Sequence, residues 1–70
     1  TLSLHDALPI FDHIVTTSRQ HLLSGGWLLV EHGWTQGEAV RALFTEAGYA
    51  AVKTCRDYGG NERLTLGQWL

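Results

Sequence analysis

Histidines and one cysteine are the side chains of this sequence best suited to acid–base chemistry or metal binding. His13, His21 and His32 are candidate metal ligands, and Glu31 with His32 could act as an acid–base pair. Adjacent strand residues point to opposite faces, however, so Glu31 and His32 cannot easily converge on one atom. No second cluster of cysteines or carboxylates stands at ligand spacing, which favours surface or strand-end histidines over a metal site. Cys55 has no evident activating base and is expected to be a structural thiol.

Charged residues flank a glycine-rich turn late in the sequence. Asp57 precedes Gly59-Gly60-Asn61, and Glu62 and Arg63 follow it. Such a turn between two β-prone segments predicts a hairpin. Opposite charges on facing strands attract each other, so we expect a cross-strand ion pair here rather than a contact with a substrate.

The composition is that of a small globular domain without a strong charge. The sequence has 70 residues, 44% of them hydrophobic, and a formal net charge of −2. This balance provides no basic surface for direct binding of nucleic acid or an anionic membrane, and no apolar run is long enough to span a bilayer. A single cysteine excludes an internal disulfide and fits a reducing cytoplasm. Without a basic groove, the tryptophans are expected to pack rather than to stack on bases: Trp27, Trp34 and Trp69.

The elements that must position these residues begin with an amphipathic helix. Apolar or small residues recur at helical spacing from Phe11 to Leu22 and predict one buried face: Phe11, Ile14, Val15, Ser18 and Leu22. Ser24-Gly25-Gly26 should end this helix, because glycine enters the left-handed cap conformation without steric cost.

A continuous apolar run, Trp27 to Val30, follows the glycines. A strand that is apolar on both faces is typical of a parallel α/β sheet covered on both sides. The segment from Glu31 to Trp34 then lies at the carboxyl end of this strand. Ligands of open α/β sheets bind at that edge, so polar residues here carry more functional weight than elsewhere.

The segment from Thr35 to Glu38 has the form of a capping box and predicts a helix that starts close to Gln36. Its buried stripe is expected to be Val40, Leu43, Phe44 and Ala47. The expected outer face is Glu38, Arg41 and Glu46. Gly48 is a suitable terminator.

The last elements are two strands. The segment from Tyr49 to Tyr58 is β-prone, with Val52, Thr54 and Arg56 on one face and Lys53, Cys55 and Asp57 on the other. Polar residues on both faces place this strand near the margin of a sheet. After the turn, Arg63 to Leu66 returns antiparallel as the second arm of the hairpin. The order is helix, strand, helix, strand, strand, in which the strand–helix–strand unit makes the first two strands parallel by a right-handed crossover.

Taken together, these segments resemble one enzyme family. The sequence of residues 22–41, 47–49 and 54–67 is similar to the C-terminal part of release factor glutamine methyltransferases of the HemK/PrmC type. The most selective features are Glu31-His32-Gly33 with Gln36-Gly37, followed by the hairpin that contains Arg56 to Gly59 and Glu62-Arg63.

The resemblance implies a class I methyltransferase that uses S-adenosylmethionine. Its substrate would be the side-chain amide of the glutamine in the Gly-Gly-Gln motif of peptide chain release factors. The implied fold is a Rossmann-like α/β sheet whose last strand inserts antiparallel between its two predecessors.

The residues that perform this chemistry in the family have no counterpart in the sequence. They are a glycine-rich cofactor loop, an acidic residue that holds the ribose and an Asn-Pro-Pro-Tyr motif. Gly25-Gly26 and Gly59-Gly60 are not substitutes, because a cofactor loop follows a strand and opens a helix. We therefore assign no catalytic, cofactor-binding or metal-binding residue, and we expect the fragment alone to be inactive.

The first ten residues have a different origin. Residues 1–10 match, residue for residue, the translation of ACT CTT TCC CTA CAC GAC GCT CTT CCG ATC, the end of a common sequencing-library adapter. We expect them to be an artefact fused in frame to residues 11–70, the C-terminal portion of a catalytic domain that continued upstream of Phe11. Chemical signals within the segment are then accidental: a helix N-cap at Ser3 and Asp6, a first-turn proline at Pro9, and half a catalytic pair at His5 and Asp6.

Two other function classes stay open. The chain could belong to another class I methyltransferase with the same terminal topology. It could also be a non-catalytic α/β module that self-associates through the strand at Trp27 to Val30, whose edge and apolar face would be exposed outside a larger sheet.

Overall fold

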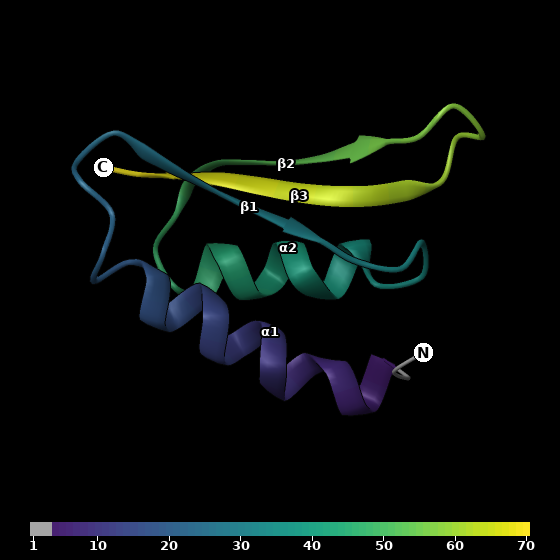
Figure 1. The fold of residues 1–70 in the computed structure, drawn as a ribbon, viewed down its shortest axis with the longest axis horizontal. Helices are drawn as coiled ribbons and strands as arrows, with labels where there is room; N and C mark the ends of the chain where they lie inside the picture. The colour runs from purple at the N-terminus through teal and green to yellow at the C-terminus, as the bar shows by residue number, and fades with distance from the viewer. Residues whose placement is uncertain (1–3) are drawn as a thin grey trace.

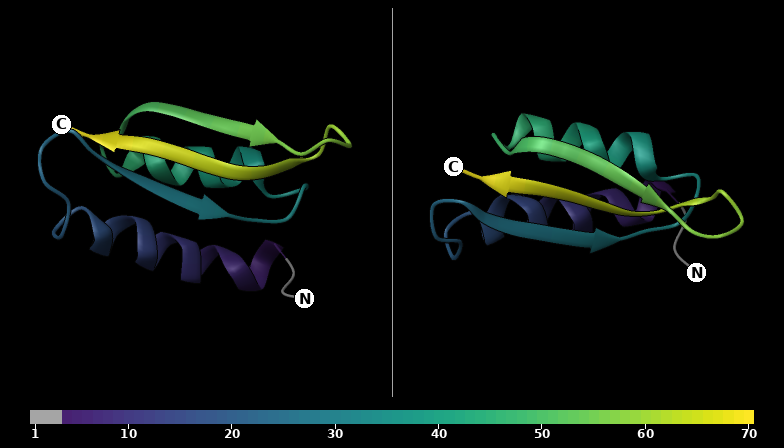
Figure 2. Two further views of the ribbon diagram at one scale, coloured as in Figure 1. Left: turned by 45° about the horizontal axis from the view of Figure 1, so that its top comes forward. Right: turned by 90° about the horizontal axis from the view of Figure 1, so that it is seen from above.

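The structure is a computed structural model that describes the backbone of residues 4–70 and the side chains from residue 8 onward. The order of elements agrees with the prediction: α1 (Leu4–Ser18), β1 (Gly26–Glu31), α2 (Gly37–Glu46), β2 (Ala50–Arg56) and β3 (Glu62–Trp69). Both helices lie on the same side of a three-stranded sheet (Figure 1). The chain is therefore α/β, as expected, with the second face of the sheet left without a helix in the described residues (Figure 2).

The last strand occupies the centre of the sheet. The strand order is β1-β3-β2, and β3 is antiparallel to both neighbours, so β1 and β2 run parallel to each other. Leu29 faces Leu66 across the β1–β3 pair, and Thr54 faces Thr65 across the β2–β3 pair. The expected insertion of the last strand between its predecessors is thus confirmed, and β2 lies at the margin of the sheet as predicted.

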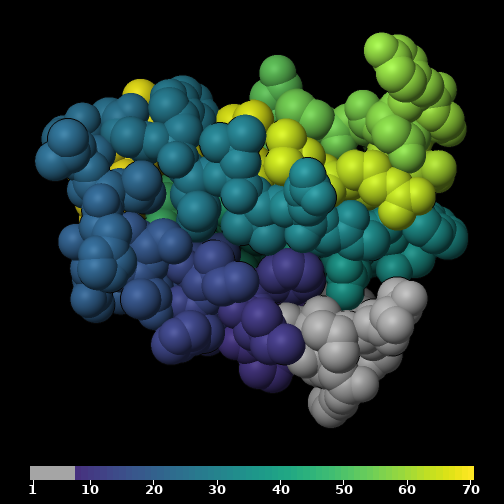
Figure 3. Space-filling view, viewed as in Figure 1, coloured from purple at the N-terminus to yellow at the C-terminus, as the bar shows by residue number. Residues whose placement is uncertain are grey.

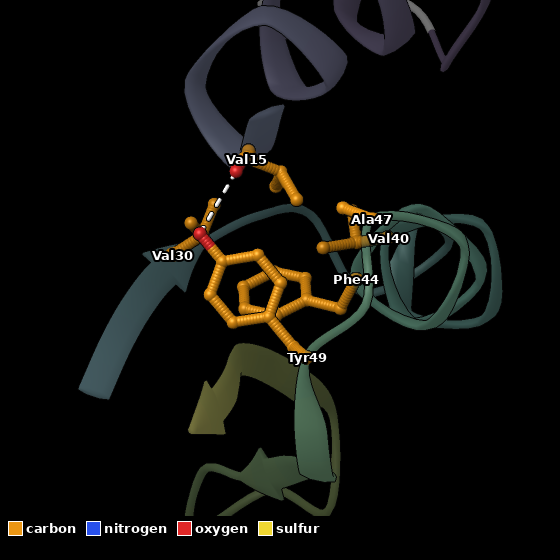
Figure 4. Close-up of a cluster of buried hydrophobic side chains, with 6 residues drawn as sticks. All are labelled: Val15, Val30, Val40, Phe44, Ala47 and Tyr49. Atoms are coloured by element: carbon orange, nitrogen blue, oxygen red, sulfur yellow. Dashed lines mark hydrogen bonds between the residues drawn. The ribbon is translucent and has the colours of Figure 1, made fainter. Parts of the chain in front are cut away.

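A small hydrophobic core lies between the sheet and the two helices (Figure 4). It consists of Val15, Val30, Val40, Phe44, Ala47 and Tyr49. The ring of Tyr49 is at its centre, with its centroid 5.1 Å from that of Phe44 and 5.3 Å from that of Trp69. Of the stripe predicted for α2, Val40, Phe44 and Ala47 are buried and Leu43 is half-buried.

Helix α1 differs from the prediction at both ends. It spans Leu4–Ser18, so it crosses the boundary at residue 10 and contains Pro9 in its interior rather than in its first turn. It ends at Ser18, before the glycines; Gly25, with φ of 86°, instead turns the loop into β1. The side chains of Ser3, His5 and Asp6 lie outside the described part of the chain. On the predicted apolar face, Val15 is buried, but Ile14 is 38% exposed.

The expected capping box of α2 is wrong. The N-cap is Gln36, without a side-chain cap hydrogen bond, and Thr35 is exposed. The helix ends as predicted at Gly48, which has φ of 98° and donates its N–H to the Thr45 carbonyl oxygen over 3.1 Å. Together with the hydrogen bond from the Tyr49 N–H to the Phe44 carbonyl, this is a Schellman motif. The predicted start close to Gln36 is confirmed, since α2 begins at Gly37, and only the capping contacts differ from the prediction.

The prediction that β1 is buried on both faces is also wrong for this chain. Leu28 and Val30 face the helices, whereas Trp27 is 46% and Leu29 is 56% exposed on the other face. Trp34, at 61% exposed, likewise does not pack as expected, while Trp69 does. The uncovered face explains both exposed β1 side chains, because burial on that side needs a layer that the described residues do not supply.

Tyr49 links α1 to the sheet. Its ionisation should lower the stability of the fold at alkaline pH. Its hydroxyl donates a hydrogen bond of 2.8 Å to the Val15 carbonyl oxygen. Burial raises the pKa of Tyr49 above its ordinary value of 10.0, and the nearby Arg19 guanidinium partly offsets this. Because the folded-state pKa is the higher one, this stabilisation is complete below pH 10.0 and is lost as the pH rises through the folded-state value.

We expect Tyr49→Phe to lower the free energy of unfolding by about 0.5–1.5 kcal/mol at neutral pH, through loss of this hydrogen bond. The variant should also lose the part of the alkaline destabilisation that Tyr49 causes. Urea unfolding across the alkaline range would measure both effects. An equal loss of stability with pH in the two proteins would contradict the assignment.

Candidate functional site

The candidate site is the carboxyl end of β1 and the turn that leads into α2, residues 31–36. The structure separates Glu31 from His32 as predicted, because Glu31 is exposed whereas His32 is only 8% exposed. His32 is therefore a strand-end histidine, as expected, but not one on the surface. The two side chains do not form an acid–base pair.

His32 is held by hydrogen bonds at both ring nitrogens. Its Nδ1 lies 2.9 Å from the Gly33 carbonyl oxygen, and its Nε2 lies 2.8 Å from the hydroxyl oxygen of Thr65. Thr65 is fully buried on the central strand. The ring therefore connects the end of β1 to β3 beneath the first turn of α2.

The hydrogen bonds continue from Thr65 to the neighbouring strand β2 and from there to α2. The hydroxyl oxygens of Thr65 and Thr54 are 2.8 Å apart, and Arg41 Nη1 donates to Thr54 Oγ1 over 2.9 Å. The same nitrogen lies 2.9 Å from Glu62 Oε2 in a salt bridge. We call these five side chains the polar network: His32, Thr65, Thr54, Arg41 and Glu62.

Sequence reasoning missed most of this network. Arg41 was expected on the outer face of α2, but its guanidinium reaches the sheet and pairs with Glu62. Thr54 and Thr65 face each other on neighbouring strands, with their side chains toward the helices. The available signal was a pair of threonines on the inward positions of two facing strands, where a polar partner from the covering helix is needed.

The turn after β1 is closed by Gly33 and Gln36. The Gly33 N–H donates to Gln36 Oε1 over 2.6 Å, and the Gln36 N–H donates to the Gly33 carbonyl oxygen over 3.0 Å. Gln36 is 7% exposed, so its side chain is part of the turn rather than a free ligand. The next residue, Gly37, lies against the Glu62 carboxylate, which would have to move to make room for a Cβ there.

The ion pair expected at the hairpin is present between Asp57 and Arg63, with 3.0 Å between Oδ2 and Nε. Asp57 Oδ1 also accepts the N–H groups of Gly59 and Asn61, at 2.9 and 3.0 Å. Glu62 does not join this pair but binds Arg41. The hairpin projects from one corner of the molecule (Figure 3), so its ionic contacts support the turn rather than a binding pocket.

The stability of the hairpin should depend on acid pH through the pKa of Asp57. The Asn61 N–H, then the Arg63 side chain, hold the pKa of this carboxyl below its ordinary value of 3.8. Its contribution is therefore present above pH 3.8 and is lost as the pH falls through the lower folded-state value. We expect Asp57→Ala to speed amide exchange at Gly59 and Asn61 and to leave exchange at Thr65 unchanged, as NMR would show. Slow exchange at both turn amides in the variant would contradict this role.

The other candidate residues stay apart in the described structure. Cys55 is a half-buried free thiol, and His13 and His21 are exposed. From residue 8 onward, no group of three or more histidines, cysteines and carboxylates could hold a metal ion. No described helix is long and apolar enough to cross a membrane.

The chemistry available at the site is structural. In the described part of the chain, every buried side-chain nitrogen or oxygen has a hydrogen-bond partner. The buried members of the polar network are thus bonded to one another, while the side chains of Arg41 and Glu62 at its end are partly exposed. Its position at the carboxyl end of β1 makes it a support for the edge where a ligand of an open α/β sheet binds.

Comparison with known proteins identifies the relatives of this chain. No family model matches it. It is 65% identical over 57 residues to the release factor glutamine methyltransferase of Escherichia coli strain K12 and 63% identical over 57 residues to that of Salmonella typhimurium. In both cases the match covers 81% of this chain and 21% of the relative.

A longer match is found in Pseudomonas aeruginosa. The release factor glutamine methyltransferase of that organism is 56% identical over 64 residues, which are 91% of this chain and 23% of the relative. The chain thus spans about a fifth of the length of the curated relatives it matches. The family resemblance expected from the residues is confirmed: the chain is homologous, over that matched part, to the release factor glutamine methyltransferases.

Proposed function

We propose that this chain forms the C-terminal part of a protein-(glutamine-N5) methyltransferase. The intact enzyme would transfer a methyl group from S-adenosylmethionine to the Gly-Gly-Gln glutamine of peptide chain release factors. The observation that carries the proposal is the 65% identity over 57 residues to the release factor glutamine methyltransferase of Escherichia coli. The inserted central strand β3 supports it, since the resemblance implies this topology.

The described residues do not fit the cofactor, which supplies an activated methyl group when bound. The one connection that follows a strand and opens a helix is the turn before α2, and its helix N-terminus faces the Glu62 carboxylate at Gly37. Glu62, paired with Arg41 at 2.9 Å, already occupies the space beside this N-terminus, which argues against the carboxylate of S-adenosylmethionine binding there. The role proposed for this chain is therefore to close the sheet and hold the end of β1, while residues outside it bind the cofactor and perform the transfer.

A chimera tests the proposal directly. The matching segment of the Escherichia coli relative is replaced by residues 11–70, and methylation of a release factor is followed with S-adenosylmethionine labelled in the methyl group. We expect the chimera to methylate the Gly-Gly-Gln glutamine, and a variant release factor with alanine at that glutamine to stay unlabelled. A folded chimera without activity, beside an active parent, would refute the proposal.

The chain alone should not bind the cofactor. We expect isothermal titration of the 70-residue chain with S-adenosylmethionine to give no saturable heat, with the chimera as the positive control. Clear saturable binding would show that the cofactor site lies within these residues. Transfer of the methyl group to a small molecule or nucleic acid, with no transfer to release factors, would favour another class I methyltransferase.

A second candidate function is self-association of the chain through β1. It is favoured by the exposed Trp27 and Leu29 and by the position of β1 at the end of the strand order, which leaves one edge unpaired within residues 4–70. Leu29→Lys should then abolish a concentration-dependent dimer seen by sedimentation. Leu23→Lys is the matched control, because Leu23 is 85% exposed outside the sheet. A monomer at all concentrations would exclude this function.

We further propose that residues 1–10 are adapter-derived and that the parent enzyme is cytoplasmic. The first proposal rests on the match of all ten residues to the adapter translation. The second rests on a substrate that acts in translation and on a lone, free cysteine. Genomic sequence upstream of the codon for Phe11 tests the first, and fractionation of cells that express the intact gene tests the second.

A further inference from the structure

The polar network has a fixed direction of donation. At one end, Arg41 can only donate, and its Nη1 lies 2.9 Å from Thr54 Oγ1. At the other end, the Gly33 carbonyl oxygen can only accept, and His32 Nδ1 lies 2.9 Å from it. The protons of the Thr54 hydroxyl, the Thr65 hydroxyl and the His32 ring must therefore be placed to suit a donor at one end and an acceptor at the other.

The carbonyl at the histidine end sets the tautomer. Nδ1 must carry a proton, since an unprotonated Nδ1 would place its lone pair against the Gly33 oxygen. The neutral ring then accepts at Nε2, so the Thr65 hydroxyl donates to it over 2.8 Å. Thr65 has used its single proton, and Thr54 donates to Thr65 while it accepts from Arg41. Every hydrogen bond points the same way, from Arg41 on α2 across the helix-covered face of the sheet to the turn.

We propose that His32 is a positioning residue, fixed by Thr65 as the neutral Nδ1–H tautomer, that holds the Gly33 carbonyl and thereby the turn from Gly33 to Gln36. Both the ring and the Gln36 N–H donate to this one carbonyl oxygen, at 2.9 and 3.0 Å. Loss of the Thr65 hydroxyl releases the ring and with it one of the two hydrogen bonds that hold the Gly33 carbonyl. That this matters for methyl transfer rests on the proposed function, in which this chain holds the end of β1 at the edge where ligands of open α/β sheets bind.

The tautomer can be measured on the whole 70-residue chain. Two-bond correlation of ring protons with ring nitrogens in 15N-labelled protein distinguishes the two neutral forms. We expect an Nδ1–H ring for His32 in the unaltered chain and in Thr65→Ser, which keeps the hydroxyl. In Thr65→Val, which keeps the shape and removes the hydroxyl, we expect the Nε2–H form to appear and exchange of the Gly33 and Gln36 amides to become roughly tenfold faster.

Thr45→Val is the matched control, since Thr45 is an exposed threonine whose hydroxyl bonds only within α2. It should leave the His32 ring unchanged. An Nε2–H ring in the unaltered chain would overturn the proposal even if Thr65→Val failed to fold. So would a Thr65→Val protein in which the ring and both turn amides behave as before.

The chimera separates this inference from the proposed function. In the chimera, Thr65→Val should lower kcat by roughly tenfold or more with less effect on KM. The reason is that a displaced turn from Gly33 to Gln36 would no longer hold the reacting groups in the geometry that the transfer needs. Thr65→Ser, which keeps the hydroxyl, should leave kcat close to that of the unaltered chimera. Full activity of Thr65→Val, despite a changed tautomer, would reduce the network to a stabilising role and overturn the positioning claim. An inactive unaltered chimera would instead refute the proposed function and leave the NMR result as the test of the tautomer.

Discussion

Phe44→Ala is expected to lower the free energy of unfolding by about 3–5 kcal/mol, a large part of the stability of a small domain. Phe44 is completely buried, and its ring lies between the sheet and the rest of α2 with its centroid 5.1 Å from that of Tyr49. The core consists of six buried residues, so few other side chains can move into the space that the ring leaves. Circular dichroism with urea unfolding would measure the loss.

Tyr58→Ala is the matched control for this change. It also replaces an aromatic ring with a methyl group, but Tyr58 is fully exposed in the hairpin. We expect its free energy of unfolding to stay within about 0.5 kcal/mol of the unaltered value. Similar losses in the two variants would mean that Phe44 is not part of the core described here.

Gly67→Ala is expected to lower the free energy of unfolding by about 1–3 kcal/mol, as for other insertions into a filled core. A Cβ at Gly67 would lie 2.6 Å from Phe44 Cδ2 and 3.0 Å from Tyr49 Cβ. The sign of the change in the free energy of unfolding tests the contact, because alanine in place of glycine in a strand is otherwise favourable by roughly 0.5–1 kcal/mol. Urea unfolding would measure the change, and a gain in stability would contradict the close approach of β3 to α2.

A double-mutant cycle identifies the cause of this loss. Phe44→Leu removes part of the ring that the new methyl group meets, so Gly67→Ala should cost less in that background than in the unaltered chain. The contact with Tyr49 Cβ remains, so some of the cost should persist. Strict additivity of the two changes would indicate that the methyl group and the ring do not meet.

The parts of the fold that were predictable are those fixed by local chemistry. Gly48 ends α2 and Gly59-Gly60-Asn61 turns the chain, because both positions need backbone conformations that few residues adopt. The order of elements then limited the sheet to a few topologies. By contrast, the capping box expected from Thr35 to Glu38 does not form, because Gln36 is the N-cap and its side chain accepts from the Gly33 N–H instead.

The errors at the site have one physical source. Whether Arg41 faces solvent or the sheet, and whether Leu29 is covered, depends on neighbours that are distant in the sequence. Periodicity reports which residues share a face, but it does not report what lies opposite that face. The burial of His32 depends on Thr65, which is 33 residues away, and no local pattern contains that contact.

The central place of β3 has a consequence for synthesis of the chain on the ribosome. In this sheet β1 and β2 are each paired only with β3, which is translated after both of them. Until β3 has left the exit tunnel, β1 and β2 have no strand partner among the described residues, and their unpaired backbone N–H and C=O groups stay open to other nascent chains. The sheet therefore closes in one late step rather than strand by strand, and its formation waits for contacts that are distant along the chain.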